Sequence, residues 1–573
     1  MGLRLLCSAL IVLSSACGRG DGASGGTELL DLDADGDPET TDCDDRDGDI
    51  HHDAVEILYD GIDQVCDGLQ DDDDRDGDGA LCFWDGAGCS LDCDDQDASV
   101  YPGAMELCDG ADQDCDGVAD DGAEAVELDE VCGNGIDDDC DGEVDGCARE
   151  GEIGAEDADA WFLGSTAGSF ALGGLGPPGD VTGDGVGDVV VQDGVLDADG
   201  VTWTTLVYVY AGPVSGSLND QAAAAVLSDR ESYYDGSASG DLDGDGLADL
   251  AFGRMYGSGS ASIDVFAGPV AGTLAFGDAD VSLVSDEPDT LTSIMSLDVG
   301  DLNVDETLDL LGSVTWQDAS YACASGDRIV VHYGPLSVAS ASLTDADVTL
   351  EGDSDHCFSV ATFAGDLDGD GAQDIAVGAS SAALYFGATY VLRGPVADTQ
   401  LDAADVVLWG DELAGYLGED VESAGDMDED GRDDLWVMSY ARSSNGDESG
   451  DAQLVRGSRV GVETGAAVVV SGREAGGATG LAAGDLNGDA RPDVALASGT
   501  LPGAVGVFYG PLEGASTLDD ADLLIRGEED GCLGYVYLFT GDASGDGLTD
   551  LLASDYCRDG YASGAYLFTM SGW

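Results

Sequence analysis

The sequence predicts an all-β fold in which seven repeated units form a closed β-propeller, and three observations support this prediction. First, an acidic stretch such as GDLDGDGLADLAFG (240–253) occurs seven times at spacings of 57 to 65 residues. Second, every unit contains short β-branched and aromatic runs separated by Gly, Pro and Asp, which is typical of strands and turns. Third, this part of the chain lacks a long apolar period of 3.6 residues. Four short strands in each unit of about 60 residues match the blades of a propeller.

The repeated stretch places carboxylates at every second position and then continues into an apolar run. Its copies begin at Gly179, Gly240, Gly300, Gly365, Gly425, Gly484 and Gly541. Such closely spaced carboxylates repel each other, so the pattern predicts a bound cation. Calcium is the expected ion because it takes about six to eight oxygen ligands from flexible loops. Position 12 is never a glutamate and strands follow the loop, which distinguishes it from an EF-hand.

Counted from the first aspartate, positions 1, 3, 5 and 9 are expected to supply side-chain oxygens. Position 7 is expected to offer its carbonyl, and a glycine at position 6 allows the sharp turn. The predicted ligands, loop by loop, are Asp180, Thr182, Asp184 and Asp188; Asp241, Asp243, Asp245 and Asp249; Asp301, Asn303, Asp305 and Asp309; Asp366, Asp368, Asp370 and Asp374; Asp426, Asp428, Asp430 and Asp434; Asp485, Asn487, Asp489 and Asp493; and Asp542, Ser544, Asp546 and Asp550.

The seven loops are not equivalent. The second, fourth and fifth have aspartate at all four positions. The sixth has Ala490 where glycine is expected. The third has Glu306 at that turn and departs most from the pattern, so we expect it to bind calcium most weakly. We expect about four to seven ions in total, with a structural role, because an ion that binds only the folded state stabilises it.

The segment LWGDELAGYLGEDVESAGDMDEDGRDDLWV (408–437) has the order strand, Gly-rich turn, strand, acidic loop, strand. In this order it resembles the FG-GAP repeats of the integrin α-subunit propeller and of related bacterial surface proteins. The resemblance extends over roughly residues 150 to 573. It implies a seven-bladed propeller over 148–573 with calcium in its loops. It also implies that partners bind the loops at the opposite end of the strands.

The phase of the repeat predicts how the ring closes. The region opens with DADAWFLGST (157–166), which corresponds to the strand ADVVLWG of a later unit. It ends with YLFT (566–569), which corresponds to the strand that precedes ADVVLWG in such a unit. A strand near Trp161 to Leu163 is therefore expected to complete the last blade beside Tyr566 to Thr569. This exchange joins the two ends of the propeller and removes an exposed sheet edge.

The loops opposite the acidic loops contain aromatic residues and arginines, which often anchor interfaces. The candidate partner contacts are Arg254, Tyr256, Trp316, Tyr321, Tyr440, Arg442, Tyr556 and Arg558. Two disulfides, Cys323 with Cys357 and Cys532 with Cys557, are expected near the same face.

The N-terminus, MGLRLLCSALIVLSSACGRG, has one arginine before a short apolar run that ends in small residues. This composition is typical of a secretory signal, here residues 1–16, and the run is too short for a membrane span. Residues 13–17 resemble a bacterial lipobox, which implies lipidation of Cys17 and a tether over 17–30. We therefore expect an exported protein of the bacterial cell envelope, an outer-membrane or surface lipoprotein. The alternative is an ordinary cleaved signal and a secreted protein.

Residues 31–147 form a different module, with ten cysteines between positions 43 and 147. In an exported chain this indicates disulfides. The unit DCDDQDASVYPGAMELCDGADQDCDG (92–117) and its variant from Asp42 resemble the metal-binding motif repeats of bacterial surface proteins. Tyr59 replaces the middle cysteine of the variant, so Cys43 is expected to pair with Cys66 and, by analogy, Cys93 with Cys115.

The metal of this module is left open by the sequence. Hard carboxylates dominate, as in Asp31, Asp33, Asp35 and Asp37, and favour calcium. Copper or zinc capture is the alternative, with the pair His51-His52 as a candidate copper ligand. We expect the module to act as a stalk stiffened by disulfides and calcium.

The charge of the chain excludes several functions. The formal net charge is −103, and all 17 basic residues are arginines. Without lysine there is no Schiff-base or P-loop lysine, and so acidic a chain repels nucleic acid. The sequence thus indicates a calcium-stabilised surface binding or adhesion protein. Its partner is an unknown protein or glycan, and its only membrane contact is a lipid anchor. The alternative is an enzyme on a propeller scaffold, such as a polysaccharide lyase or hydrolase, although no catalytic motif is evident.

Overall fold

The computed structural model of the chain describes the propeller almost completely and a few residues before it. The described residues are 44, 47, 50, 100, 115, 149, 151–163, 175–196, 203–230, 232–256, 260–285, 291–317, 327–337, 341–352, 358, 360–443, 448–463, 465–473, 477–499, 502–512, 514–528, 531–555 and 564–570. The chain divides into two compact units, 1–126 and 127–573. The predicted signal, the tether with Cys17 and nearly all of the Cys/Asp-rich module, His51 and His52 included, lie outside the described residues.

The second unit contains seven antiparallel blades. Blade 1 consists of β3 (Leu175–Gly179), β4 (Asp188–Leu196), β5 (Trp203–Tyr210) and β7 (Ala225–Arg230). Blade 2 consists of β8 (Ser232–Gly240), β9 (Asp249–Tyr256), β10 (Ala261–Phe266) and β12 (Val281–Val284). Blade 3 consists of β13 (Leu291–Gly300), β14 (Asp309–Gln317), β15 (Arg328–His332) and β17 (Val348–Glu351). Blade 4 consists of β18 (Val360–Gly365), β19 (Asp374–Ala379), β20 (Ala388–Leu392) and β22 (Val406–Trp409).

Three more blades complete the ring. Blade 5 consists of β23 (Leu417–Gly425), β24 (Asp434–Ser439), β25 (Asp451–Val455) and β28 (Val468–Ser471). Blade 6 consists of β29 (Ala478–Gly484), β30 (Asp493–Ser498), β31 (Ala504–Phe508) and β33 (Leu523–Arg526). Blade 7 consists of β34 (Leu533–Gly541), β35 (Asp550–Asp555), β36 (Gly564–Phe568) and β2 (Ala160–Leu163).

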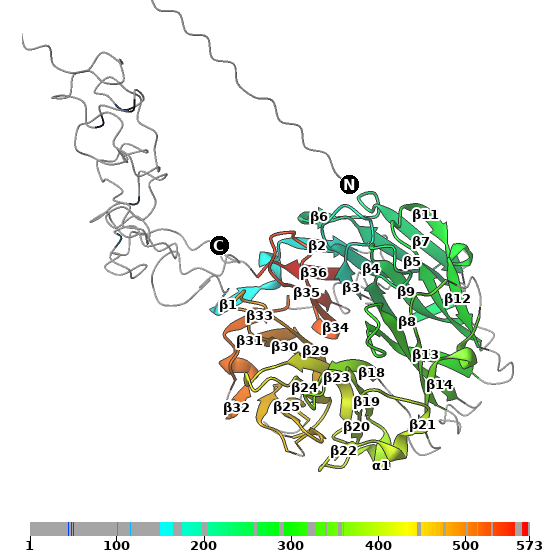
Figure 1. Cartoon of the computed structure of the whole chain (residues 1–573), viewed down its shortest axis with the longest axis vertical. Coiled ribbons are helices and arrows are strands. Elements are labelled where there is room, and N and C mark those ends of the chain that lie inside the picture. The colour runs from blue at the N-terminus through cyan, green and yellow to red at the C-terminus, as the bar shows by residue number, and fades with distance from the viewer. Residues whose placement is uncertain are drawn as a thin grey trace, which may run out of the picture. The chain divides into compact units, whose positions relative to one another are not determined.

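The first strand of each blade lies at the centre of the ring and contacts the first strands of both neighbouring blades (Figure 1). Apolar residues fill every space between adjacent blades, giving seven separate core clusters, one for each blade-to-blade interface. The cluster that joins blade 7 to blade 1 includes Phe162, Tyr208 and Leu567. The predicted seven-bladed ring is therefore confirmed and is closed. Its second strands, such as DIAVGA in blade 4, are apolar without alternation because both of their faces are covered.

The predicted strand exchange is also confirmed. Strand β2 pairs antiparallel with β36, with Trp161 opposite Tyr566, and Figure 1 shows the cyan β2 beside the red β36. The sequence did not predict that the preceding strand β1 (Gly151–Gly154) pairs in parallel with β33 of blade 6. Residues 151–163 thus complete two neighbouring blades.

The pairing of β1 with β33 is one case of a general feature that the sequence analysis missed. Six of the blades carry a fifth, parallel strand from the following unit. Besides β1 these are β6 (Gly216–Leu218), β11 (Gly272–Ala275), β16 (Ala341–Ser342), β21 (Thr399–Gln400) and β32 (Gly514–Thr517). Single-turn 3-10 helices follow five of the six: η1 (Ala155–Asp157), η2 (Phe276–Asp278), η3 (Leu343–Asp345), η4 (Leu401–Ala403) and η5 (Leu518–Asp520). Blade 4 instead has a small hairpin beside it, β26 (Gly457–Ser458) with β27 (Gly461–Val462).

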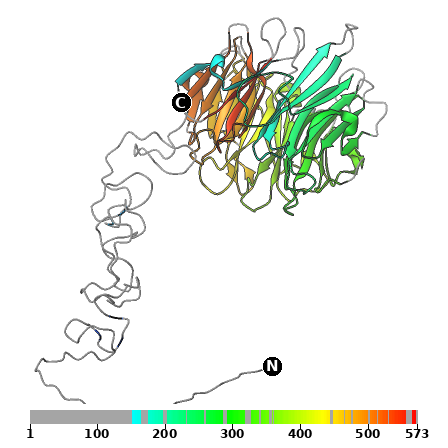
Figure 2. The same cartoon turned by 90° about the horizontal axis from the view of Figure 1, so that it is seen from above.

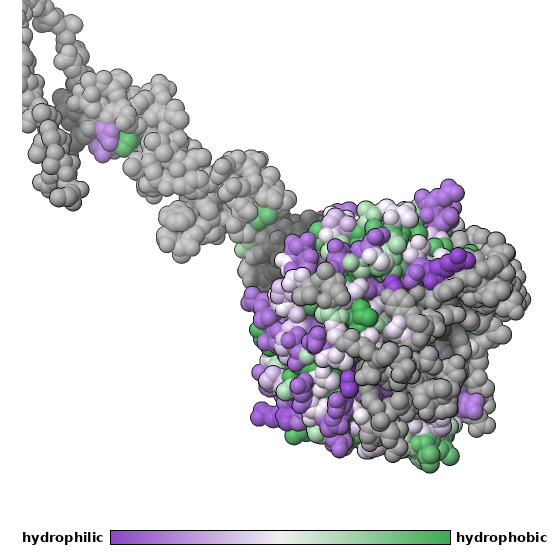
Figure 3. Space-filling model, turned by 90° about the vertical axis from the view of Figure 1, so that its right-hand side faces the viewer, coloured by the Kyte–Doolittle hydropathy of each residue, from purple (hydrophilic) through white to green (hydrophobic). Residues whose placement is uncertain are grey.

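The strands run between two faces of the propeller, which Figure 2 shows from the side. Hydrophilic residues cover much of the surface described in Figure 3, and the hydrophobic ones form small separate groups. Within the described ranges, no helix has the length and apolarity needed to cross a membrane.

Candidate metal centres and the opposite face

All seven predicted acidic loops lie on one face of the propeller, which we call the loop face. Each loop connects the first strand of a blade to the second, so position 1 follows the inner strand and position 9 begins the next one. In blade 2, for example, Asp241 follows β8 and Asp249 is the first residue of β9. The structure therefore places the predicted ligands of each loop together.

Four of the loops bring three carboxylates to within 4.8 Å of one another. The groups are Asp180, Asp184 and Asp188; Asp241, Asp243 and Asp249; Asp366, Asp368 and Asp374; and Asp426, Asp428 and Asp430. They include the three loops that the sequence identifies as complete. In the other three loops, all of which the structure describes, no three carboxylates lie this close. The loops of blades 3, 6 and 7 each have Asn or Ser at position 3.

Backbone amides hold the carboxylate at position 1 in place. In the loop of blade 2, Oδ1 of Asp241 accepts hydrogen bonds from the N–H groups of Gly244 and Asp245 at 2.7 and 3.0 Å. Its Oδ2 accepts one from Gly246 at 2.9 Å. The same set recurs around Asp180 and Asp366. The loop backbone is therefore wound around this carboxylate.

Two positions of each loop have a left-handed backbone, whereas the sequence analysis identified only position 6. Gly244 at position 4 and Gly246 at position 6 of the blade 2 loop have φ angles of 82° and 91°. In the blade 3 loop these positions are Val304 and Glu306, with φ of 58° and 71°. A β-branched residue pays a steric penalty in this region. The structure thus adds a second departure to the loop that we expect to be weakest.

The aspartates at position 9 have a role beyond that of ligands. We call Asp188, Asp249, Asp309, Asp374, Asp434, Asp493 and Asp550 the position-9 aspartates, and all seven are buried. In blade 4, Oδ2 of Asp374 accepts the N–H of Leu367 at position 2, at 2.9 Å, and Oδ1 accepts that of Gly394 at 2.7 Å. Gly394 lies in the turn after the third strand, and equivalent turn residues serve blades 1, 2, 3, 5 and 6. This carboxylate therefore connects two turns of one blade.

Burial raises the pKa of every position-9 aspartate, and the backbone hydrogen bonds only partly oppose this effect. The pKa rises to about 7 for Asp374, Asp493 and Asp550, and to about 6 for Asp434. Nearby carboxylates of the same loop contribute to the shift. A cation bound in the loop would favour the charged form of these groups and so oppose the rise in their pKa.

Arginines lie beside two of the loops. Nη1 of Arg393 lies 2.9 Å from Oδ2 of Asp368 in the blade 4 loop. Nε of Arg456 lies 3.0 Å from Oδ2 of Asp428 in the blade 5 loop. Blades 1 and 2 have alanine at the corresponding place, Ala211 and Ala267, directly before the Gly-Pro turn. Two loops that look complete in sequence are thus partly neutralised by the protein itself.

The opposite face carries a group of aromatic residues, which we call the tyrosine cluster: Tyr385 and Tyr440, which are exposed, and Tyr416, which is half-buried between them. The ring centroids of Tyr385 and Tyr416 are 5.5 Å apart, and those of Tyr416 and Tyr440 are 6.1 Å apart. Backbone hydrogen bonds join the three segments, since the N–H of Tyr416 donates to the carbonyl of Tyr385 and the N–H of Ala441 donates to the carbonyl of Gly415. Tyr440 was predicted as a partner contact, and it is exposed as such a contact must be.

The other two tyrosines were missed because their loops differ from those considered. Tyr385 belongs to α1 (Ala382–Tyr385), an irregular turn between β19 and β20 in which residues 383 to 385 have φ angles of 51°, 62° and 67°. Tyr416, with φ 58°, lies between β22 and β23. Both residues lie at the end of blade 4 that is opposite its acidic loop, and this position in the repeat could have identified them as candidate partner contacts. Leu384 and Leu413 are exposed beside them in sequence.

The two predicted arginines on this face behave differently. Arg442 binds both carboxylate oxygens of Asp411 at 2.9 Å and also contacts Asp451 at 2.8 Å, so it fixes the loop that follows Tyr440. The structure does not support the prediction that Arg254 is a partner contact. It is buried within β9, where its guanidinium contacts Asp264 at 3.1 Å and lies over the ring of Phe276. Strand β9 extends past this residue, so Arg254 does not reach a partner.

Most of the remaining predicted partner contacts and disulfide cysteines lie outside the described residues. The backbones of Tyr256 and Trp316 lie near the ends of β9 and β14, with their side chains outside the described part. Tyr321, Tyr556, Arg558, Cys323, Cys357 and Cys557 lie outside the described residues, as do Cys43, Cys66 and Cys93. Cys115 and Cys532 are disulfide-bonded, and the predicted pairings stay predictions.

Comparisons with known families agree with the two parts of the chain. The Cu-binding MopE model, described as "Putative metal-binding motif", matches residues 42–72, 92–121 and 127–146. The FG-GAP repeat model matches residues 358–392, which include β18, β19 and β20 of blade 4. The fold is therefore a seven-bladed β-propeller in which part of blade 4 matches the FG-GAP repeat model, and it is preceded by three matches to the metal-binding motif, as the sequence predicts.

Among solved structures, the chain is similar to one titled "Crystal structure of BBS1N in complex with ARL6DN, soaked with mercury". The identity is 13%, the match covers 72% of this chain and 99% of that chain, and the TM-score is 0.37. Among proteins of curated function, none matches.

Proposed function

We propose that this protein is a calcium-stabilised binding or adhesion protein of the bacterial cell surface. The propeller is the scaffold, and its tyrosine cluster contacts a protein or glycan partner. The Cys/Asp-rich module is the stalk, attached through a lipid on Cys17. The observation that supports this proposal is the combination of a face built from seven metal-type loops with an opposite face that carries the tyrosine cluster, of which Tyr385 and Tyr440 are exposed.

Calcium fits the loops on chemical grounds. The donors are carboxylate, amide, hydroxyl and carbonyl oxygens in loops of nine residues, and hard oxygen ligands select a hard cation. The residues that would hold it are those at positions 1, 3, 5 and 9. Bound calcium would supply positive charge to a chain with a formal charge of −103, whose surplus negative charge otherwise opposes folding.

The first experiment is a calcium titration of the full chain after chelation, followed by elemental analysis. We expect about four to seven ions in the propeller loops, with at least four from the loops that bring three carboxylates together, and further ions from the N-terminal motifs. The variants Asp241→Asn and Asp366→Asn should each remove one ion. A chain that binds no calcium, or one whose count is unchanged in both variants, contradicts the proposal.

Partner binding is tested with fluorescently labelled chain on whole bacterial cells, in calcium and in chelator. We expect calcium-dependent binding that the double variant Tyr416→Ala with Tyr440→Ala lowers at least tenfold. The matched control is Val460→Ala, which removes an exposed apolar side chain from the hairpin after the third strand of blade 5. Equal binding by the double variant and the control would exclude the tyrosine cluster as the contact.

An enzyme on a propeller scaffold is the second candidate, and one observation favours it. Asp420 and Glu422, which line the cavity at the centre of the ring, both have a raised pKa, as a general acid requires. Weighing against it, no arginine or histidine is among the described residues that line this cavity. A polysaccharide lyase needs a base and a stabiliser for its enolate. Release of unsaturated or reducing ends from acidic and neutral polysaccharides would identify a lyase or hydrolase.

Metal capture by the N-terminal motifs is the third candidate, and the family match over residues 42–146 supports it. Elemental analysis of the full chain after incubation with equal calcium, copper and zinc distinguishes the two roles. Calcium alone indicates a stalk. Copper or zinc that is lost in the variant His51→Ala with His52→Ala indicates capture.

A further inference from the structure

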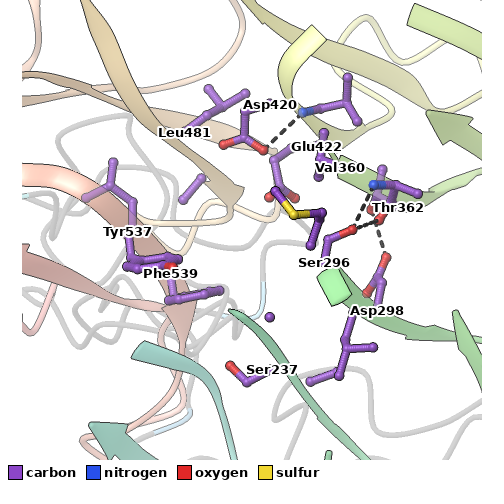
Figure 4. A pocket seen from close by; sticks show the side chains of 18 of the residues that line it. Ser237, Ser296, Asp298, Val360, Thr362, Asp420, Glu422, Leu481, Tyr537 and Phe539 are labelled. Carbon is purple, nitrogen blue, oxygen red and sulfur yellow. Dashed lines mark hydrogen bonds between the residues drawn. The ribbon is translucent and has the colours of Figure 1, made fainter. Parts of the chain in front are cut away.

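The centre of the ring contains a cavity of about 560 Å³, which we call the central cavity. Inner strands of six blades line it, and Figure 4 shows acidic and hydroxyl side chains on one side and aromatic ones on the other. Its volume lies in the range of small-molecule sites. None of the predicted calcium ligands lines it.

Four acidic residues line this cavity, Asp298, Glu419, Asp420 and Glu422, and two of them have hydrogen-bond partners. Asp298 on β13 accepts the hydroxyl of Thr362 and the N–H of Phe363, both at 2.8 Å, and so connects blade 3 to blade 4. Asp420 on β23 accepts the N–H of Val421 at 3.0 Å. These two groups therefore have a structural role at the inner strands.

Glu422 differs from both because no described residue donates a hydrogen bond to it. It lies two residues after Asp420 on the same face of β23 and points into the cavity without a bond (Figure 4). Glu422 is half-buried and lines the cavity. A partly desolvated carboxyl group without a donor is costly, which calls for a ligand that supplies donors.

The wall across from Glu422 is apolar. The rings of Tyr537 and Phe539 on β34 stack with centroids 6.2 Å apart and an interplanar angle of 8° (Figure 4). Leu481 on β29 continues this wall. A cation is attracted to aromatic faces as well as to carboxylates. The two sides of the cavity therefore favour one kind of molecule, a cationic group on an apolar body.

The chemistry of the lining excludes other occupants. An anion would face four acidic residues, and no basic residue is among the described residues that line the cavity. A bare metal ion fits the loops better, because the described carboxylates of the cavity do not form a group within 4.8 Å as those of four loops do. An organic cation needs no such convergence.

We propose that the central cavity binds a small organic cation, a guanidinium, amidinium or primary ammonium group on a short apolar stem, with Glu422 as its counter-ion. The stem packs on Tyr537 and Phe539. The proposal does not depend on calcium in the loops. It goes beyond the proposed function, which assigns no role to the centre of the ring.

The cation can come from two sources. It is either a free amine or a basic side chain of a partner protein. The second source is geometrically possible because Glu419 and Tyr440 line both the central cavity and the adjoining cavity that contains Tyr385 and Tyr416. A partner seated on the tyrosine cluster could thus insert an arginine.

The test is calorimetric titration of the calcium-saturated full chain with benzamidine, and with benzamide as its neutral isostere. We expect one benzamidine per chain, bound at least tenfold more tightly than benzamide. The variant Glu422→Gln should lose at least tenfold in benzamidine affinity. The matched control Glu463→Gln removes the same charge from an exposed residue outside the cavity and should bind as the wild type does.

Three outcomes would overturn the proposal: no benzamidine binding at millimolar concentration, equal binding of benzamide, or unchanged binding by Glu422→Gln. Misfolding does not confuse the result, because Glu422 makes no hydrogen bond that glutamine would lose, and the melting temperature of each variant is recorded. Calcium stoichiometry measured on the same samples reports separately on the proposed function.

The source of the cation is then resolved with the peptide acetyl-Gly-Arg-Gly-amide and its citrulline analogue. Arginine-dependent peptide binding that Tyr440→Ala weakens, while benzamidine binding stays unchanged, identifies a partner side chain. Benzamidine binding without peptide binding identifies a free amine.

Discussion

The two faces of the propeller are built on different principles. On the loop face, nearly the same nine-residue loop occurs seven times, and a position-9 aspartate connects it by backbone hydrogen bonds to the rest of its blade. On the opposite face, the connections differ in length and conformation from blade to blade. Five non-glycine residues between 383 and 416 have a left-handed backbone there, and they include Tyr385 and Tyr416 of the tyrosine cluster.

This difference separates stability from recognition. A repeated loop whose carboxylates are held by amides contributes to the stability of every blade, so its effects add up around the ring. An irregular face with left-handed residues contributes less to stability, and such strain persists mainly at functional sites. We therefore expect changes on the loop face to affect folding and changes on the opposite face to affect binding.

Removal of calcium should have the largest effect, and it should depend on pH. An acid whose pKa is higher in the folded than in the unfolded chain stabilises the fold below its unfolded value, near 4 for aspartate. That contribution is lost as the pH rises through the folded value, about 7 for Asp374, Asp493 and Asp550. The metal-free chain should therefore lose stability from pH 5 to pH 8.

Calcium replaces these protons, so its benefit should grow with pH. We expect it to raise the melting temperature by about 10 °C or more at pH 8 and by much less at pH 5. Scanning calorimetry at both pH values, with calcium and with chelator, measures this. A calcium effect that is equal at both pH values would show that the position-9 aspartates do not exchange protons for metal.

The next largest effect separates the two roles of the loop carboxylates. In chelator at pH 8, Asp374→Asn should lower the free energy of unfolding by about 3 kcal/mol, because its amide cannot accept hydrogen bonds on both sides. The control Asp370→Asn keeps the oxygen that accepts the N–H of Ala372 and should change it by less than about 0.5 kcal/mol. Urea titration checks both variants. Equal losses would mean that position 9 is only a ligand.

Backbone strain can be compared directly between the faces. Val304 on the loop face and Leu384 on the opposite face are exposed and have φ angles of 58° and 62°. Replacing either with glycine should raise the free energy of unfolding by about 1 kcal/mol. Leu413→Gly is the control, because Leu413 is exposed without a positive φ and glycine should destabilise it. Thermal melting of the three variants measures these changes in stability.

The smallest effect concerns the arginine beside the blade 4 loop. Arg393→Ala should raise the calcium affinity of that loop about threefold, because a partly exposed ion pair contributes little free energy. Arg328→Ala removes an arginine that pairs with Glu351 away from the loops and serves as the control. Calcium titration with a fluorescent competitor measures both. A drop in affinity would show that Arg393 orders the loop instead of competing with calcium.

The sequence predicted the ring, its closure by β2 and the seven loops because these depend on periodicity and phase. It did not predict the parallel fifth strands, because their pairing involves two or three residues without a pattern of their own. It misplaced Arg254 because burial depends on how far β9 extends. It missed Glu422 because the lining of the central cavity comes from several blades, and it missed Tyr416 because the loop between β22 and β23 was not considered. The conformation of a loop can be predicted from the sequence of one repeat. The environment of a side chain depends also on the neighbouring blades, whose residues are about 60 positions away in the sequence.

The closure by β2 sets the order in which this protein can be completed. Some 400 residues separate Leu163 from Gly564, its partner in β36. At about 5 to 20 residues per second, a ribosome needs on the order of 20 to 80 seconds to make that stretch. Throughout this time β1 and β2 exist without the blades that they complete. The apolar side chain of Phe162 must therefore stay out of wrong pairings until the last strand appears, which makes these 13 residues (151–163) the segment most in need of a chaperone.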